Sequence, residues 1–509
     1  MTQKPRPFFS FFGSVFSSIK KAVSENPDVK RIVEHHPRFF NFLKNRLKRR
    51  QFTGLPLTLI AIVFAYALVQ FFGIVQDIIA SDPIVNVDTR VNNLLFSLRA
   101  PSSIRFFLSI TYLGKWDLFL LLLVVASLLF LVWRRKSYII PMWLTVGLTE
   151  LFVFFGKVFI HRPRPNGIIP VYIEDSFSFP SGHAAGAIAF YGFLAYAFGR
   201  NTKNEKYRWT VIICSAIVIF LIGFSRIFLG VHYLSDVLGG YLIGFLILIA
   251  VTATREWLMY KHGVPMPSKS PRLRLKVFSA CIIAAVAVFY VVTVRQFVPT
   301  LNSYESSFSN EVTIANALEP FTDGKLPKYT ETITGRSQEP LGMLILAKSD
   351  DDLVRSFRAS GWLLADRINF ASLIEIAKAS MLNRPYPQAP MTPSFWNKNV
   401  NDFGFQRPTE TNTARERHHA RFWKTNLRSA DGYNIYVGTA SLDIGIKWVV
   451  THRIRPDIDT ERDVLLQDLR HANVVTSVNV QKFVNPVLGK NFSGDSFFTD
   501  GEIDIIHLR

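Results

Sequence analysis

The chain has 509 residues, 49% of them hydrophobic, with a net charge of +20 and only two cysteines. Its mean hydropathy of +0.20 is too high for an average soluble protein and too low for membrane helices alone, so two or three domains are expected. A disulfide framework is excluded. Residues 1–297 carry 34 Lys and Arg against 13 Asp and Glu, whereas residues 298–509 carry 24 against 25. The basic excess therefore belongs to the apolar half, which argues for membrane topology and against a nucleic-acid partner.

The first region, residues 1–54, is basic, with 12 Lys and Arg against 3 acidic residues. It lacks the apolar core of a signal peptide. Phenylalanines cluster near its start, at Phe8, Phe9, Phe11, Phe12 and Phe16. We expect an amphipathic helix that lies on the cytoplasmic membrane surface.

Seven apolar runs follow, each close to the roughly 20 residues that cross a bilayer as a helix. They lie at 55–80, 117–133, 138–160, 183–199, 209–228, 235–252 and 275–297. The sequence thus predicts a six-span α-helical membrane bundle at 55–252, then a basic loop and a seventh span at 253–297. Glu150 lies inside the third run, and we expect it to face the bundle interior.

Loop charges set the orientation of these spans. With the N-terminus in the cytoplasm, the inner loops hold 25 Lys and Arg (1–54, 134–136, 200–208 and 253–276), and the outer loops hold 6 (81–116, 161–182 and 229–234). The positive-inside rule therefore predicts a cytoplasmic N-terminus. Seven spans place residues 298–509 outside the membrane, in the periplasm of a Gram-negative cell.

Residues 298–509 are predicted to form a soluble α+β domain. Length and β-branched content indicate strands at 342–348, 433–440, 447–454 and 502–508, and a helix at 351–362.

Three polar clusters interrupt the membrane half, and the predicted topology places all of them on its outer face. They are Lys157 with Arg164-Pro165, Pro180-Ser181-Gly182-His183, and Ser225-Arg226 with His232 and Asp236. Three cations, Lys157, Arg164 and Arg226, would repel one another without a bound dianion such as phosphate, and too few acidic residues lie nearby to match them. Ser181 and Gly182 begin the fourth run, where backbone N–H groups and a helix dipole favour an anion, and Gly182 has no side chain to block it.

The two histidines complete a site for phosphoryl transfer, in which one attacks phosphorus and the other protonates the leaving oxygen. His232 and Asp236 are four residues apart, so that a helix would place them on one face. A carboxylate there would orient the imidazole and stabilise its cation. We therefore expect His232 to be the nucleophile and His183 the general acid, whereas His161 and Arg162 are expected to have no role.

These residues carry a family resemblance. The patterns K-x6-R-P, P-S-G-H and S-R-x5-H-x3-D, in this order and without substitution, resemble the signature of the type-2 phosphatidic acid phosphatase and vanadium haloperoxidase superfamily. The resemblance covers roughly residues 55–252. It implies metal-independent hydrolysis of a phosphomonoester or diphosphate, without a cofactor, through a phosphohistidine. It implies the same roles: phosphate binding by Lys157, Arg164, Ser181, Gly182 and Arg226, and catalysis by His183, His232 and Asp236.

The tail resembles a second family, through "RERHHARFW" (415–423), "VTHRIRPDIDTERD" (450–463) and "FTDG" (498–501). These stretches are similar to the LssY-type C-terminal domain, which implies no role. Three histidines (His418, His419 and His452) and the acidic run 457–463 raise the alternative of a metal site. Arg462 stands where a calcium loop needs glycine, so we instead expect Thr460 and Asp463 to form a capping box.

The sequence thus predicts an integral membrane phosphatase that acts on a lipid phosphate or diphosphate at the outer leaflet of a bacterial inner membrane. Phosphatidic acid, phosphatidylglycerol phosphate and a polyprenyl diphosphate all fit as substrates. A lipid phosphotransferase would use the same residues. A non-catalytic anchor for a periplasmic binding domain is the alternative from another class, which the intact signature disfavours.

Overall fold

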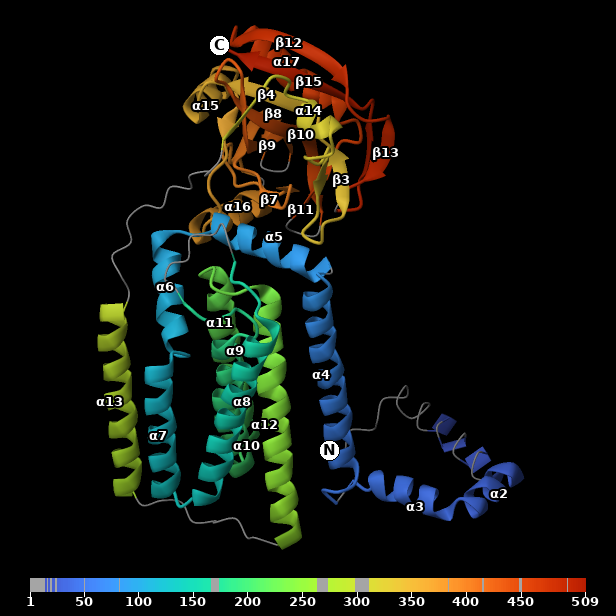
Figure 1. Cartoon of the computed structure of the whole chain (residues 1–509), viewed down its shortest axis with the longest axis vertical. Helices are drawn as coiled ribbons and strands as arrows, with labels where there is room; N and C mark the ends of the chain where they lie inside the picture. The colour runs from blue at the N-terminus through green and yellow to red at the C-terminus, as the bar shows by residue number, and fades with distance from the viewer. Residues whose placement is uncertain are drawn as a thin grey trace.

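A computed structural model describes residues 14–509 except 16, 19–20, 23–24, 50, 82, 166–173, 263–272, 298–310, 383, 414–415, 448–450 and 492. The chain forms a helical bundle with a strand-rich domain at one end (Figure 1). The expected phenylalanine cluster at 8–16 lies outside the described residues.

The bundle contains the membrane helices. Within the described residues, five helical stretches are long and apolar enough to cross a membrane: Leu55–Ala80, Lys136–Ile160, Glu205–Phe228, Leu234–His262 and Leu273–Gln296. They correspond to α4 (Leu55–Ala80), η1 with α8 (Lys136–Tyr138, Ile139–Ile160), α11 (Glu205–Phe228), α12 (Leu234–His262) and α13 (Leu273–Phe297). A sixth span forms if α6 (Pro101–Tyr112) and α7 (Trp116–Val132), bent by 45°, count as one. The protein is thus a multi-pass membrane protein.

The predicted span 183–199 has a different form. It consists of α9 (Gly182–Ala187), a π-helical turn η2 (Ile188–Gly192) and α10 (Phe193–Asn201), and it is not among the described helices that are long and apolar enough to cross a membrane. Small residues let it pack closely: a Cβ on Gly240 of α12 would lie 2.5 Å from the Ser181 carbonyl oxygen, and one on Gly244 2.4 Å from that of Ala185. Glu150 of α8 lies beside this segment, 3.1 Å from where a Cβ of Gly186 would be.

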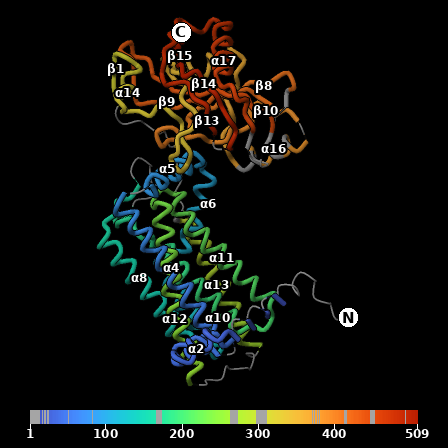
Figure 2. The backbone as a smooth tube through the Cα atoms, turned by 90° about the vertical axis from the view of Figure 1, so that its right-hand side faces the viewer, coloured from blue at the N-terminus to red at the C-terminus, as the bar shows by residue number. Residues whose placement is uncertain are grey.

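Among the described residues of the N-terminal half, helices α2, α3 and α5 lie outside the bundle proper. α5 (Pro83–Ser97), within the expected outer loop, lies across the end of the bundle beneath the strand-rich domain (Figure 1). α2 (Pro27–His35) and α3 (Pro37–Arg46) lie at the opposite end (Figures 1 and 2). Their exposed apolar side chains fit the expected surface helix: Ile32, Val33, Phe39, Phe42, Leu43 and Leu47.

The C-terminal domain is built on a nine-stranded sheet, in the order β12-β15-β4-β10-β9-β8-β5, with β1 beside β9 and β11 beside β10. The bounds are β1 Val312–Ile314, β4 Met343–Ala347, β5 Leu363–Leu364, β8 Phe403–Thr413, β9 Glu416–Ser429, β10 Asn434–Lys447, β11 Thr451–Ile454, β12 Val475–Lys482 and β15 Glu502–Leu508. Most neighbours are antiparallel, whereas β15 pairs with β4 and β1 with β9 in parallel.

Both faces of this sheet are covered. α15 (Asp350–Ala359) and α17 (Asp459–His471) pack on one face, where Phe357 and Leu465 join the buried core. The other face carries α14 (Glu319–Thr322) and a four-stranded sheet of β3 (Ser337–Pro340), β2 (Tyr329–Glu331), β6 (Phe395–Trp396) and β7 (Asn399–Val400). α16 (Phe370–Leu382) and the hairpin β13 (Val487–Lys490) with β14 (Ser496–Thr499) complete the domain.

The predicted elements of the tail agree in position with β4, α15, β10 and β15, although β10 continues to Lys447. Residues 448–450 of the strand predicted at 447–454 lie outside the described residues. The capping box is wrong: α17 begins at Asp459, and the Thr460 hydroxyl donates to Asp457 at 2.9 Å. Arg462 lies 3.5 Å from Asp459 and 3.3 Å from Asp463, so that the acidic run pairs with this arginine, which also binds Asp500 at 3.0 Å. Among the described residues, no group of three His, Cys, Asp or Glu side chains could hold a metal.

Candidate active site

The three polar clusters of the sequence lie at the end of the bundle that faces the C-terminal domain. Lys157 is in the last turn of α8, and Arg226 is in the last turn of α11. Ser181 precedes α9, and His232 precedes α12, whose first turn contains Asp236. Hydrogen bonds join the clusters: Arg164 donates to the Val231 carbonyl at 2.6 Å, and the Ser181 N–H donates to that of Asp236 at 3.0 Å.

Arg164 and Arg226 converge on a carboxylate, that of Glu174. Arg164 Nη2 lies 2.7 Å from Glu174 Oε2, and Arg226 Nη2 pairs with Oε1. Arg226 is fully buried and also donates to Thr111 Oγ1 at 2.8 Å. Lys157 Nζ binds Ser176 Oγ at 2.8 Å, and Arg164 Nη2 binds the same oxygen at 3.0 Å. Two oxygens of an anion are thus held by the two arginines that the motifs assign to phosphate.

Glu174 modifies the expectation that these cations lack acidic partners. Burial alone raises the pKa of its carboxyl group, but His183, His232, Arg164 and Lys157 outweigh burial and lower that pKa below its ordinary value. The carboxylate is therefore charged at neutral pH and is surrounded by the same groups that would surround a phosphate. Its two oxygens stand in for two phosphoryl oxygens.

His232 is buried, with 1% of its side chain exposed. Its Nδ1 lies 3.4 Å from Asp236 Oδ2, and its Nε2 lies 3.4 Å from Arg164 Nη1. Asp236 is oriented by the Tyr233 N–H, which donates to Oδ2 at 2.8 Å. Nδ1 of the imidazole therefore faces the carboxylate, and Nε2 faces the side on which Arg164 holds the anion.

Arg162 was expected to have no role, but it lies directly behind Asp236. It donates from Nη1 to Asp236 Oδ1 at 2.6 Å and from Nη2 to Asp88 Oδ2 at 2.7 Å. Asp88, on α5, also accepts from the Ser235 N–H at 2.9 Å. Sequence reasoning missed Asp88 because it lies 148 positions from Asp236 in the printed sequence and in no motif. The one available signal was an acidic residue in a predicted outer loop.

Ser181 and Gly182 are only partly placed as expected. The Ser181 N–H is already bonded to Asp236, so it does not point at an anion. The Ser181 hydroxyl is buried and makes no hydrogen bond to any described residue. A Cβ on Gly182 would point toward α8, where it would lie 3.5 Å from Val153, an ordinary contact distance.

His183 lies at the first turn of α9, against the bend between α6 and α7. A Cβ on Gly114 at that bend would lie 3.0 Å from His183 Cδ2, so glycine is needed for this approach. The charged forms of both histidines lower the pKa of Glu174. The arrangement joins an anion clamp, a His–Asp pair and a second histidine, which suits phosphoryl transfer.

Comparison with known proteins identifies the family. Phosphatidylglycerophosphatase B of Bacillus subtilis is 31% identical over 191 residues, which are 37% of this chain and 94% of that protein. This chain belongs to the PAP2 superfamily. The PAP2 superfamily model matches residues 138–260, and the model for the LssY C-terminus matches residues 324–503.

Other PAP2 relatives match a smaller part. Lipid A 4'-phosphatase of Porphyromonas gingivalis is 30% identical over 102 residues, 18% of this chain and 40% of that protein. Undecaprenyl-diphosphatase BcrC of B. subtilis is 36% identical over 92 residues, 17% of this chain and 42% of that protein. Among solved structures, the transmembrane PAP2-type phosphatidylglycerolphosphate phosphatase from B. subtilis is 29% identical, with a TM-score of 0.35, over 39% of this chain and 96% of that one.

Proposed function

We propose that this PAP2 protein is a membrane lipid phosphatase that hydrolyses a lipid phosphate or diphosphate through a phosphohistidine. The observation that carries the proposal is the Glu174 carboxylate, held by Arg164 and Arg226 beside His232. All three named relatives are phosphatases, and two of the names specify a diphosphatase and a lipid A phosphatase. Phosphatidic acid, phosphatidylglycerol phosphate and a polyprenyl diphosphate remain the substrates to test.

The proposed chemical steps combine the contacts of His232 with the role that the motif resemblance gives to His183. Nδ1–H of His232 points to Asp236, which leaves the lone pair of Nε2 to attack phosphorus. The P–O bond to the lipid breaks, and His183 gives its proton to the departing oxygen. Water then attacks the phosphohistidine and transfers a proton to His183, and the P–N bond breaks to release phosphate. Arg164, Arg226 and Lys157 stabilise the phosphoryl oxygens throughout.

We also propose that the site faces the outer compartment. In this topology six spans lie at 55–252, a seventh span follows, and the C-terminal domain is on the same side of the membrane as the site. The charge bias of the loops supports this, and the site lies at the bundle end next to the C-terminal domain (Figure 1). Alkaline phosphatase fused after Pro299 should be active, and a fusion after Lys269 should be silent. The reverse pattern would refute the proposed orientation.

The deciding test is covalent trapping. Purified protein given a ³²P-labelled lipid phosphate and quenched in alkali should carry acid-labile label. His232→Ala should lose the label and about 10⁴-fold or more of turnover, as expected for loss of a nucleophile. EDTA should leave activity unchanged, because three cations supply the charge that magnesium supplies elsewhere. Label that persists in His232→Ala would refute the nucleophile.

A further inference from the structure

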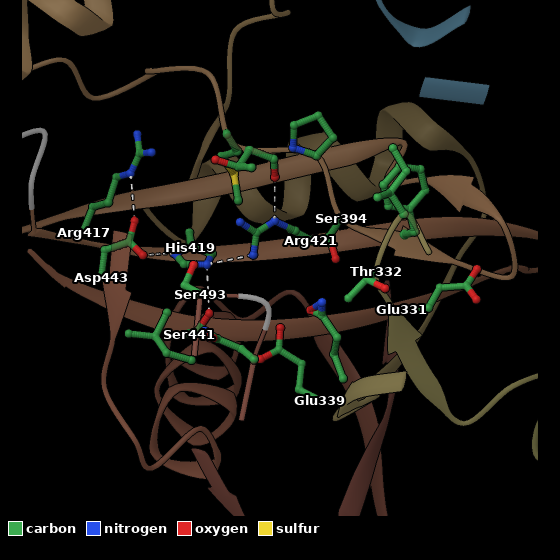
Figure 3. A pocket seen from close by; sticks show the side chains of 18 residues that line it. Glu331, Thr332, Glu339, Ser394, Arg417, His419, Arg421, Ser441, Asp443 and Ser493 are labelled. Carbon is green, nitrogen blue, oxygen red and sulfur yellow. Dashed lines mark hydrogen bonds and ion pairs between the residues drawn. The ribbon is translucent and has the colours of Figure 1, made fainter. Parts of the chain in front are cut away.

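The C-terminal domain contains a cavity of about 200 Å³ between the large sheet and the strands that cover it. Its floor is made by alternate residues of two paired strands, which point to one face because side chains of a strand alternate. β9 contributes Arg417, His419 and Arg421, and β10 contributes Ser441 and Asp443. Glu339 of β3 and Ser394 approach from the covering layer (Figure 3).

Most of the polar floor is satisfied internally. Arg417 lies 3.4 Å from Asp443 and donates to Gln406 at 2.7 Å. His419 Nδ1 lies 3.2 Å from Asp443 Oδ1, and Ser441 Oγ lies 2.8 Å from His419 Nε2. These groups are buried and neutralise one another.

Ser441, His419 and Asp443 have the connectivity of a hydrolase triad, but Arg421 argues against nucleophilic catalysis. Arg421 Nη1 lies 2.9 Å from the same His419 Nε2, and arginine can only donate. Nε2 is therefore unprotonated, and burial keeps the pKa of His419 below its ordinary value. If His419 took the serine proton, two cations would stand side by side, so the geometry favours binding over attack by Ser441.

Two charged groups that line the cavity, Arg421 and Glu339, have polar atoms without a hydrogen-bond partner among the described residues. Arg421 uses Nη1 on His419 and Nε on the Thr392 carbonyl at 3.3 Å, and its Nη2 makes no hydrogen bond to any described residue. The Glu339 carboxylate, on a residue only 8% exposed, makes no hydrogen bond or ion pair to the described part of the chain. Burial raises the pKa of Glu339, and Arg421 only partly offsets this. Figure 3 shows Arg421 and Glu339 entering the same space from opposite sides.

We propose that this cavity binds a small zwitterion, with its anionic oxygens on Arg421 and its ammonium group on Glu339. An anion alone would face the Glu339 carboxylate, and a cation alone would face Arg421, whereas a zwitterion satisfies both. At about 30 Å³ per water molecule, the cavity has room for about seven waters, which is the size of an amino-ethyl phosphonate or an amino acid. The other end of the cavity is Glu331, which lies 2.5 Å from Arg90 of α5. Because this end of the cavity contacts α5 of the membrane half, the zwitterion could be a free solute or the head group of a lipid.

The first test is calorimetric titration of full-length protein, in a detergent without phosphate, with 2-aminoethylphosphonate, which a phosphatase cannot hydrolyse. Wild type should bind it saturably. Arg421→Gln and Glu339→Gln should each weaken binding about tenfold or more, as for a lost charge-assisted hydrogen bond. Arg355→Gln and Glu502→Gln change exposed residues of the same domain and should bind as wild type. Arg226→Ala removes an arginine of the phosphate clamp, so probe binding as tight as in wild type in this variant separates the cavity from the phosphatase site.

A second measurement does not depend on affinity loss alone. Ethylphosphonate lacks the ammonium group, so wild type should bind it about tenfold more weakly than 2-aminoethylphosphonate. In Glu339→Gln this preference should fall to about twofold or less, and Glu339→Asp should retain part of it. No saturable binding by wild type, or equal preference in wild type and Glu339→Gln, would overturn the proposal.

The source is then distinguished in nanodiscs. If a lipid head group occupies the cavity, phosphatidylethanolamine discs should weaken binding of the soluble probe relative to phosphatidylglycerol discs. If a free solute occupies it, the two discs should give the same affinity. Both results support a zwitterion site, and loss of probe binding in both discs would contradict it.

Discussion

The two polar sites of this protein treat buried charge in opposite ways. Around Glu174, three cations of the phosphate clamp (Lys157, Arg164 and Arg226) face one carboxylate. In the C-terminal cavity, Arg417 and Arg421 face Asp443 and Glu339 in equal number, and Glu331 at the cavity end is paired with Arg90 of α5. An excess of positive charge suits a dianion that carries the reacting atom, whereas a balanced set suits a ligand that is itself neutral overall.

The sites also differ in what stands behind them. Asp236 is backed by Arg162 and Asp88, so the histidine is held by a chain of buried ion pairs that begins on α5. His419 is held by Asp443 of β10 at Nδ1 and by Arg421 of β9 at Nε2. Nε2 of His232 lies 3.4 Å from Arg164, whereas Nε2 of His419 lies 2.8 Å from Ser441 and 2.9 Å from Arg421.

The largest expected effect separates the two sites by removing one arginine from each part of the molecule. Arg226→Ala should lower kcat/KM about 10²–10³-fold, the loss typical of one group that stabilises transition-state charge. Arg462→Gln, a buried ion-paired arginine of the C-terminal domain, should lower Tm and leave kcat/KM of the folded protein within about twofold. Steady-state kinetics on a lipid phosphate checks both. Equal loss of kcat/KM in the two variants would show that the C-terminal domain is as important for catalysis as the site in the bundle.

The second effect concerns the support behind Asp236. Asp88→Asn should lower kcat about 10–100-fold with little change in KM, because Arg162 and then Asp236 lose their orientation while the phosphate clamp stays intact. Asp88→Glu should restore part of the rate. Asp77→Asn, on α4 and outside this network, is the matched control. A rise in KM with kcat unchanged would assign Asp88 to substrate binding.

A smaller effect tests whether Glu174 stands in for phosphate. Glu174→Gln should lower the inhibition constant of inorganic phosphate several-fold, because the carboxylate no longer competes for Arg164 and Arg226. The pKa of Glu174 is lowered, so the wild-type carboxylate stays charged at neutral pH. The difference should persist down to the ordinary range near pH 4.3 and shrink only below it. Identical inhibition constants for wild type and Glu174→Gln at pH 7 would show that Glu174 does not occupy the position of phosphate.

The smallest effect is a pH-dependent change of stability at Glu339. Its pKa is raised by burial, so the charged form is disfavoured in the folded protein. Wild-type stability therefore falls as the pH rises through the folded pKa, and the cost disappears below the ordinary glutamate value. Glu339→Gln should melt about 2 °C above wild type at pH 8 and within about 1 °C of it at pH 4. Thermal melts with Glu502→Gln as control measure this, and the opposite trend would mean that Glu339 is stabilised as an anion.

The sequence was enough to predict which residues gather at the phosphatase site. Lys157, Arg164, Arg226 and the two histidines are of the types that bind and transfer phosphate, and their positions at helix ends follow from hydrophobic runs. The strands β4 and β15 were also predictable, because they are short apolar runs with β-branched residues.

The sequence could not predict contacts between residues that are far apart in the chain. Arg162 resembles an interface anchor until Asp88 is seen beside it, and no local pattern links the two. The helical segment at 182–201 was predicted to be a span because alanine and phenylalanine are apolar, and the local sequence did not indicate the π-helical turn at Ile188–Gly192. Alternation on β9 does place Arg417, His419 and Arg421 on one face, but only the fold brings Glu339 over them.

α5 connects the two halves of the molecule through three side chains. Asp88 binds Arg162 of the phosphatase site, and Arg90 binds Glu331 of the C-terminal domain, while Asn93 donates to the Lys398 carbonyl at 3.0 Å. A chain cut after α13 would uncover Arg90, now 5% exposed, and release the helix that supports Asp88. The tail is therefore not a modular appendage: transplanting it, or grafting the bundle onto another partner, would require redesign of α5 as well.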